Sequence, residues 1–234
     1  MTLNSKCFEE IIDELKSQSN EFSRQGMARY GIDITRALGV SIPSLRKIAR
    51  KAGKNHALAL YLWQSDIHEA RMLASMVDEI KKVTPEQMDQ WALDFCSWDV
   101  CDQVCNNLFK YTDFAFDKAF EWAKRDEEFV KRAGFVLMAT LAVGNKSATD
   151  EQFEQFFPFI IEESTDYRNF VKKAVNWALR QIGKRNLSLN EKCIKIAEEI
   201  SQIDSKSARW IASNALKELK SSEVKNRLII KSNN

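Results

Sequence analysis

The sequence predicts an all-α protein, on the evidence of its turn residues, its helix start signals and its length. Among 234 residues there are seven glycines and three prolines, which is few for the frequent turns of a sheet-rich chain. Segments that begin at Thr84, Thr149 and Ser188 match the capping box, in which glutamine or glutamate follows a hydroxyl residue by three positions. A chain of this length with 44% hydrophobic residues can bury a sizeable core.

Apolar residues at helical spacing, together with the start signals, predict the helices in order along the chain. Pro85 occupies a first helical position, where its missing N–H costs nothing. After the last helix, residues from about 222 to 234 are expected to form a poorly ordered tail. No low-complexity linker separates the helices, so a single repeat domain is expected over residues 1–234. The predicted helices span 5–18, 42–53, 55–64, 68–80, 85–95, 98–109, 112–123, 127–143, 149–162, 167–185, 189–202 and 205–220.

Three segments of the chain resemble one another. FVKRAGFVLM at 129–138 and FVKKAVNWAL at 170–179 are near copies, and SARWIASNAL at 207–216 is similar to both. Helix pairs that recur every 30 to 40 residues are typical of a HEAT-like solenoid, an alpha-alpha superhelix in which one helix of each pair lines a concave surface. A non-repeating helical bundle is the alternative. In a solenoid, one row is expected to contain Arg71, Asp102, Arg132, Lys173 and Arg209.

The predicted helix at 98–109 carries Trp98 and Asp102 four residues apart, so that both side chains share one face. An aromatic ring beside a carboxylate favours a cationic ligand, because the ring quadrupole and the negative charge attract the same sign. A structural role is the alternative, with Ser97 as the N-cap, Asp99 and Asp102 favouring the helix dipole, and Trp98 buried. The core stripe is expected from Val100, Cys101, Val104, Cys105 and Leu108.

Two later helices carry cations that need partners. Arg132 precedes eleven residues without a charge, 133–143, and a guanidinium on so apolar a helix needs a phosphate or a carboxylate. A tryptophan among cations suits a phosphate backbone with a flat group nearby, although a solvated basic face with a half-buried tryptophan is the alternative. On the helix at 167–185 this face contains Lys173, Trp177, Arg180 and Lys184.

Charge is segregated along a chain whose net charge is only +2. Between Arg24 and Lys54 there are eight basic residues and one acid, Asp33, and from Arg168 to Asn190 there are six basic residues and no acid. A basic surface on a nearly neutral solenoid indicates an extended anionic ligand, with duplex nucleic acid first. Protein-binding solenoids also have charged faces.

Cysteine usage and hydropathy bear on the compartment. The five cysteines form no regular framework, which is typical of reduced thiols in a cytosol. There is no C-x-x-C pair, and His56 and His68 lie far from the cysteines, so no metal site is expected. The longest uncharged run, 133–145, is too short for a membrane span, and the N-terminal residues lack the order of a signal peptide. A cytoplasmic protein is expected.

At these positions the sequence resembles the AlkD family of DNA alkylation-repair glycosylases. The matching elements follow the order of that family at about its spacing: MARY at 27–30, LGVSIPSLRK at 38–47, WDVCD at 98–102, FVKRA at 129–133 and FVKKAVNWALR at 170–180. The resemblance implies a HEAT-like solenoid that cradles duplex DNA. It also implies release of N3- or N7-alkylated purines by hydrolysis of the N-glycosidic bond, without a metal or nucleotide cofactor.

The resemblance assigns roles to residues of this sequence. Asp102 matches the catalytic carboxylate, and Trp98 and Trp177 match the tryptophans that contact the lesion. The expected partner is double-stranded DNA containing alkylated bases, bound by a monomer without a small-molecule cofactor. The resemblance implies DNA contacts at Tyr30, Arg132 and Arg180, and the basic faces add Lys173, Lys184 and Arg209.

This sequence departs from the family pattern next to the expected site. Ser97 stands where the family often has another aromatic residue, and Gln103, Asn106 and Asn107 make the segment after Asp102 more polar. Two alternatives to an enzyme therefore stay open. One is a non-catalytic solenoid that recognises bent or branched duplex DNA, and the other is a protein-interaction scaffold with apolar grooves.

Overall fold

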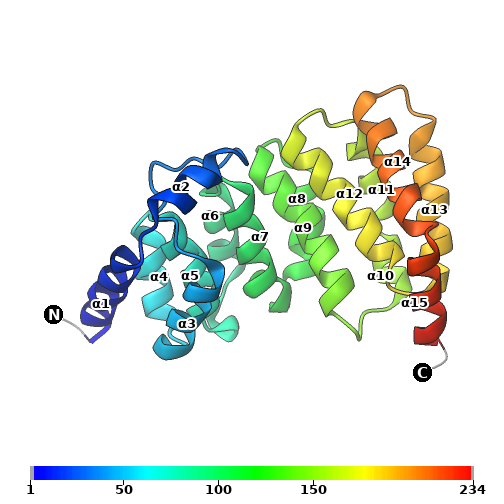
Figure 1. Ribbon diagram of the computed structural model, residues 1–234. Helices are drawn as coiled ribbons and strands as arrows, with labels where there is room; N and C mark the ends of the chain where they lie inside the picture. The colour runs from blue at the N-terminus through cyan, green and yellow to red at the C-terminus, as the bar shows by residue number, and fades with distance from the viewer. Residues whose placement is uncertain (1–2, 233–234) are drawn as a thin grey trace. The chain divides into compact units, whose positions relative to one another are not determined.

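The computed structural model describes residues 3–232, and every regular element in that range is a helix (Figure 1). The prediction of an all-α protein is confirmed. The chain divides into two compact units, of which the structure describes residues 3–112 and 113–232. A single repeat domain over the whole chain stays a prediction. Within the described range, no helix has both the length and the apolar composition needed to cross a bilayer.

The N-terminal unit is organised around α5, which packs against α3, α4 and α7. Leu58, Leu62 and Leu73 are completely buried between these helices. The elements are α1 (Leu3–Ser17), α2 (Glu21–Ala28), α3 (Ile42–Ala52), α4 (His56–Gln64), α5 (His68–Val77), η1 (Ile80–Lys82), α6 (Pro85–Leu93), α7 (Trp98–Asn107) and η2 (Phe109–Tyr111).

The C-terminal unit stacks helix pairs. In Figure 1, α9, α12 and α14 lie side by side, and each packs against the next. A Cβ on Gly134 would lie 2.6 Å from the backbone nitrogen of Ala123, so glycine allows α8 and α9 to approach closely. The elements are α8 (Ala115–Ala123), α9 (Glu128–Gly144), α10 (Asp150–Glu154), α11 (Phe157–Glu162), η3 (Glu163–Thr165), α12 (Asn169–Gly183), α13 (Leu187–Ser201), α14 (Lys206–Leu219) and α15 (Ser222–Ser232).

Three regions differ from the sequence predictions. Helix α2 was not predicted, because its large apolar residues Phe22 and Met27 are five positions apart and do not form a helical stripe; in the structure none of its residues is buried. The helix predicted at 149–162 is two helices, since Pro158 in the first turn of α11 cannot donate a backbone hydrogen bond. The predicted tail is helical through Ser232, because α15 buries Val224 and Leu228; residues 233–234 lie outside the described part.

The predicted start signals are met in different ways. At α10 the capping box is complete, with Thr149 and Gln152 bonded reciprocally. The Thr84 hydroxyl caps α6 by accepting from the Gln87 amide at 3.2 Å. The box predicted at Ser188 is wrong, because α13 begins one residue earlier, at Leu187, and Asn186 is its N-cap.

Candidate functional site

The first turn of α7 holds the residues that the sequence singled out. The predicted core stripe is confirmed, since Val100, Cys101, Val104, Cys105 and Leu108 are all buried. Trp98 and Asp102 lie outside this stripe and are half-buried. The indole Nε1 of Trp98 donates to the backbone oxygen of Tyr30 at 3.1 Å. The Tyr30 residue itself is 70% exposed. The structure thus brings together Trp98 and the backbone of Tyr30.

A hydrogen bond between His68 and Asp99 anchors the first turn of α7. His68 Nε2 lies 2.9 Å from Asp99 Oδ2, and the Ser97 hydroxyl donates to Asp99 Oδ1 at 2.7 Å. Burial acts to raise the pKa of Asp99, but hydrogen bonds from His68, Ser97 and the Val100 amide outweigh it and hold the pKa below its usual value. Asp99 is therefore held at the start of α7 by a histidine 31 residues away that the sequence did not connect to it.

The loop that carries Tyr30 is held by a buried carboxylate. Glu69 on α5 is 1% exposed and accepts hydrogen bonds from the backbone amides of Leu38, Gly39 and Val40 at 2.6–3.3 Å. Gly39 has a positive φ of 78°, and a Cβ there would lie 2.2 Å from a backbone oxygen. Three backbone amides that point to one place bind an anion, and here that anion is the carboxylate of Glu69.

Arg71, the first member of the expected row, has protein partners. Its guanidinium forms an ion pair with Asp66 at 2.9 Å and donates to the backbone oxygen of Asp94 at 3.1 Å. It also lies 5.2 Å from the centroid of the Trp63 ring, which stacks on Trp91 at 4.0 Å. Arg71 thus stabilises the packing between α5 and α6.

Arg132 is buried rather than presented to solvent. It is 5% exposed, and its Nη1 donates to the backbone oxygen of Phe170 at 2.6 Å. The sequence predicted a phosphate or carboxylate partner, and a backbone carbonyl of α12 is one partner in the structure. The neighbouring Lys131 forms an ion pair with Glu163 at 2.7 Å. These two cations tie α9 to the segments that follow it.

The basic face of α12 divides into two halves. In the first, Lys173 is exposed and Trp177 is half-buried. In the second, Arg180 and Lys184 both contact the carboxylate of Glu218 on α14, with Lys184 Nζ 2.5 Å from Glu218 Oε1. Burial acts to raise the pKa of Glu218, but the hydrogen bonds from Lys184 and Arg180 outweigh it and lower the pKa.

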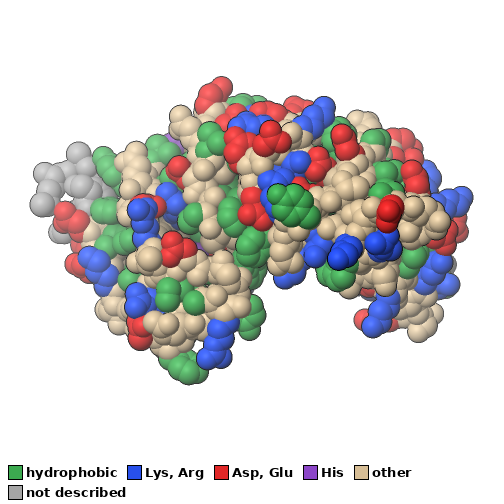
Figure 2. Space-filling view, turned by 90° about the horizontal axis from the view of Figure 1, so that it is seen from above, with side chains coloured by type: hydrophobic (Ala, Val, Ile, Leu, Met, Phe, Trp, Pro, Cys, Tyr) green, Lys and Arg blue, Asp and Glu red, His purple; other side chains and the backbone are tan. Residues whose placement is uncertain are grey.

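The third repeat segment presents an aromatic residue that the sequence reasoning missed. Trp210 is 38% exposed, and Lys172 Nζ lies 4.9 Å from its ring centroid. By position in the repeat, Trp210 corresponds to Arg132 and Lys173, whereas Arg209 falls one position earlier. Arg209 is exposed and lies 2.9 Å from Asp204. Figure 2 shows basic side chains, in blue, next to one another on the surface of the C-terminal unit.

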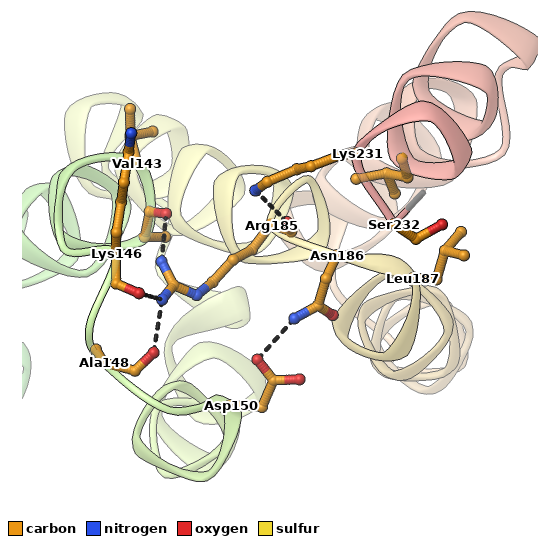
Figure 3. A pocket seen from close by; sticks show the side chains of 11 residues that line it. Val143, Lys146, Ala148, Asp150, Arg185, Asn186, Leu187, Lys231 and Ser232 are labelled. Carbon is orange, nitrogen blue, oxygen red and sulfur yellow. Dashed lines mark hydrogen bonds between the residues drawn. The ribbon is translucent and has the colours of Figure 1, made fainter. Parts of the chain in front are cut away.

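A pocket of about 510 Å³ opens where α9, α12 and α15 end (Figure 3). Arg185 donates to the backbone oxygens of Ala142 and Ala148 at 3.1 and 2.6 Å, and Lys231 donates to the backbone oxygen of Arg185 at 2.7 Å. Burial lowers the pKa of Arg185. The carbonyls of Ala142 and Arg185 lie at the carboxyl ends of α9 and α12, and that of Ala148 lies in the loop before α10, so these cations have a structural role. None of the predicted site residues lines this pocket.

The cysteines are also candidate metal ligands. Cys101, Cys105 and Cys193 are buried, and burial raises the pKa of the Cys193 thiol. Among the described residues, no group of three or more histidine, cysteine, aspartate or glutamate side chains is arranged to hold a metal ion.

Stacked helix pairs of this kind define a HEAT-like repeat protein, as predicted. A solved structure of the same fold superimposes with a TM-score of 0.80 and 20% sequence identity, over 94% of this chain and 95% of its own. That protein is described as one of "a new family of proteins related to the HEAT-like repeat DNA glycosylases with affinity for branched DNA structures".

Sequence comparison then identifies the family. Residues 11–219 match the family model described as DNA alkylation repair enzyme, and the chain belongs to this family. The predicted resemblance is thereby confirmed. Lin0241 of Listeria innocua is 23% identical over 200 residues, covering 84% of this chain and 87% of the relative. Lmo0209 of Listeria monocytogenes is 24% identical over 215 residues, covering 84% and 96%. Both relatives are described as uncharacterized proteins.

Proposed function

We propose that this protein is a DNA-alkylpurine N-glycosidase that removes cationic N3- or N7-alkylated purines from duplex DNA. One observation carries the proposal: Trp98 and Asp102 share a face of α7 outside its core, and the Trp98 indole is held by the backbone of Tyr30. In this proposal Asp102 is the catalytic carboxylate, and Trp98 and Trp177 contact the lesion. Membership of the DNA alkylation repair enzyme family supports it.

The remaining assignments follow the same proposal. The protein binds DNA as a cytoplasmic monomer, without a metal or nucleotide cofactor, and Tyr30, Lys173 and Arg209 contact the DNA. All three are exposed. Arg132 and the pair formed by Arg180 and Lys184 have protein partners, so the proposal does not depend on their contacting phosphate.

The chemistry explains why a carboxylate and two indoles suffice for this substrate class. Alkylation at N3 or N7 gives the purine a positive charge, so the bond from C1′ to the base nitrogen breaks with its electron pair going to the base. Water then adds to the oxocarbenium-like sugar and loses a proton. A carboxylate about 4 Å from the developing cation, at an effective dielectric near 20, contributes about 4 kcal/mol, or roughly a thousandfold in rate. Each indole face adds about 0.5–2 kcal/mol.

The test measures release of free base from duplex DNA containing 7-methylguanine or 3-methyladenine under single-turnover conditions. Asp102→Asn is expected to lower the rate about a thousandfold, because the amide cannot stabilise the cation. DNA affinity should change little, since the substitution removes no cation. Asp113→Asn, which removes the charge of an exposed acid outside the helices, is the matched control and should keep the wild-type rate. Undiminished release by Asp102→Asn would exclude the assigned role.

A second candidate is a non-catalytic protein that binds branched duplex DNA. The exposed Trp210 beside Lys172 favours it, because an accessible ring with a cation over it suits the unpaired bases at a branch point. The described affinity of the structural relative for branched DNA supports it further. Binding of a four-way junction at least tenfold tighter than linear duplex, with no base release from either lesion, would favour this candidate over the enzyme.

A further inference from the structure

Glu218 is the acid that meets the basic face of α12. It lies on α14, 38 residues after Arg180 and 34 after Lys184, and its carboxylate contacts both cations. No acid occurs in the sequence between Arg168 and Asn190, so this part of the chain looks uniformly basic until the neighbouring helix is in place. The three residues Arg180, Lys184 and Glu218 are called the Glu218 cluster below.

The Glu218 cluster is partly withdrawn from solvent. The exposed fraction of the side chain is 26% for Arg180, 14% for Lys184 and 29% for Glu218. Each carboxylate oxygen contacts one cation, with Oε2 facing Arg180 and Oε1 facing Lys184. Two oxygens shared between a guanidinium and an ammonium reproduce the contacts that a backbone phosphate would make with the same pair.

In the other half of the α12 face, no acid within the described part of the chain forms an ion pair with Lys172 or Lys173. Lys172 lies over the Trp210 ring at 4.9 Å, and Lys173 is exposed. The nearby Arg209 lies 2.9 Å from Asp204, which is fully exposed and therefore forms a weak, solvent-screened pair. A phosphate that approaches this half replaces water, whereas one that approaches the Glu218 cluster meets a carboxylate of its own sign.

We infer that Glu218 is an internal competitor for DNA phosphate, which confines phosphate binding on α12 to the half that contains Lys172 and Lys173. Arg180 and Lys184 are not DNA contacts while Glu218 is charged. This inference rests on the DNA binding of the proposed function, but not on base release. It also separates Lys173 from Arg180 and Lys184, three cations that the sequence alone placed on one face.

The test compares binding of a linear, unmodified 20-base-pair duplex by wild type and Glu218→Gln over a range of salt concentrations. Removing the competitor is expected to expose two further phosphate contacts, which steepens the slope of log Kobs against log salt by about 1.8. Affinity should rise about tenfold at 50 mM salt, and this advantage should nearly vanish at 200 mM.

Two further variants make the result specific. Glu198→Gln removes the same charge from a separate ion pair with Lys220, at 2.7 Å, and should leave slope and affinity at wild-type values. A triple variant, Glu218→Gln with Arg180→Gln and Lys184→Gln, removes the competitor together with both cations. The triple variant should return the slope to the wild-type value. Because it removes the carboxylate together with both of its cations, it leaves no unpaired charge, and it therefore still tests the inference if Glu218→Gln does not fold.

The outcomes separate the inference from the proposed function. If wild type binds no duplex, the proposed function itself is overturned, and the inference with it. If wild type binds but Glu218→Gln has the same slope, the inference alone is overturned. It is likewise overturned if the triple variant keeps the gain of Glu218→Gln, or if it binds more than tenfold more weakly than wild type, because Arg180 and Lys184 would then already contact DNA.

Discussion

The two units differ in the charged residues that they bury. In the N-terminal unit the buried carboxylates are Glu69 and Asp78, each within hydrogen-bonding distance of several donors. Among the described residues of the C-terminal unit, the buried charged residues are Lys118, Lys131 and Arg132, and the carboxylate of Asp166, which is 7% exposed, pairs with Arg168. A buried charge is tolerated only when it is paired and hydrogen-bonded. The N-terminal unit surrounds its buried carboxylates with backbone amides, an imidazole and a carboxamide. The C-terminal unit surrounds its buried cations with carboxylates and backbone carbonyls.

This difference has a consequence for the candidate site. The buried acid Glu69 holds the loop that carries Tyr30, whose carbonyl holds Trp98. In the C-terminal unit, Lys131 and Arg132 instead link α9 to later segments, at Glu163 and at Phe170 of α12, whereas Lys118 pairs with Glu121 of its own helix. Glu69 therefore positions a local site in one unit, whereas Lys131 and Arg132 connect successive segments of the repeats in the other. The predictions below test this contrast by removing one charge at a time.

The largest effect is expected from Glu69→Ala. Three backbone amides lose their acceptor at once, and unsatisfied buried donors cost about 1–3 kcal/mol each, so unfolding in urea should require at least about 3 kcal/mol less free energy. Glu10→Ala, at an exposed position of α1, is the control and should cost less than about 0.5 kcal/mol. An equal loss of stability in the two variants would contradict the role of Glu69 as the residue that holds the loop that carries Tyr30.

Arg132→Ala is expected to have the next largest effect. The Phe170 carbonyl loses a charged donor and the apolar contacts of the side chain are lost, which should cost about 2 kcal/mol in urea unfolding. The effect of Arg132→Ala on DNA binding distinguishes a cation that links helices from one that contacts phosphate. A cation that links repeats should leave the salt slope unchanged, whereas a cation that contacts phosphate should lower the slope by about one. A change in slope without a loss of stability would contradict the linking role.

The smallest effect is a pH dependence of the N-terminal unit. The pKa of Asp99 is lowered on folding, so its contribution to stability is present above the unfolded pKa of about 4 and is lost as the pH falls through the folded value. Asp99→Asn should therefore cost about 1 kcal/mol at pH 7. The difference from wild type should shrink in urea unfolding below pH 4. A difference that is constant from pH 7 to pH 3 would show that the charge of Asp99 does not contribute.

Local signals were sufficient for much of the fold. The scarcity of glycine and proline, the helical spacing of apolar residues and the capping residues predicted most helices and the core stripe of α7, because each depends on residues within one or two turns. The same signals missed α2, which buries no residue, and misplaced the end of the ordered chain, since the burial of Val224 and Leu228 depends on helices packed against α15.

The partners of the charged residues were beyond such signals. Arg132 was recognised as a cation in need of a partner, but the Phe170 carbonyl lies 38 residues further on, and Glu218 is equally far from Arg180. Periodicity shows which face of a helix is polar, but it carries no information about the register of the next helix against that face. An ion pair between helices is therefore invisible until both are packed.

By itself, the sequence determined most of the helices, their repetition, the family and the placing of Trp98 and Asp102 outside the core of α7, because these follow from spacing along one chain segment. Only the tertiary structure decided which cations meet an internal acid or carbonyl and which face solvent, as Lys173 does. The reason is physical: a charge is neutralised by what lies within a few ångströms of it, and in stacked helices those neighbours come from segments 30 to 40 residues away.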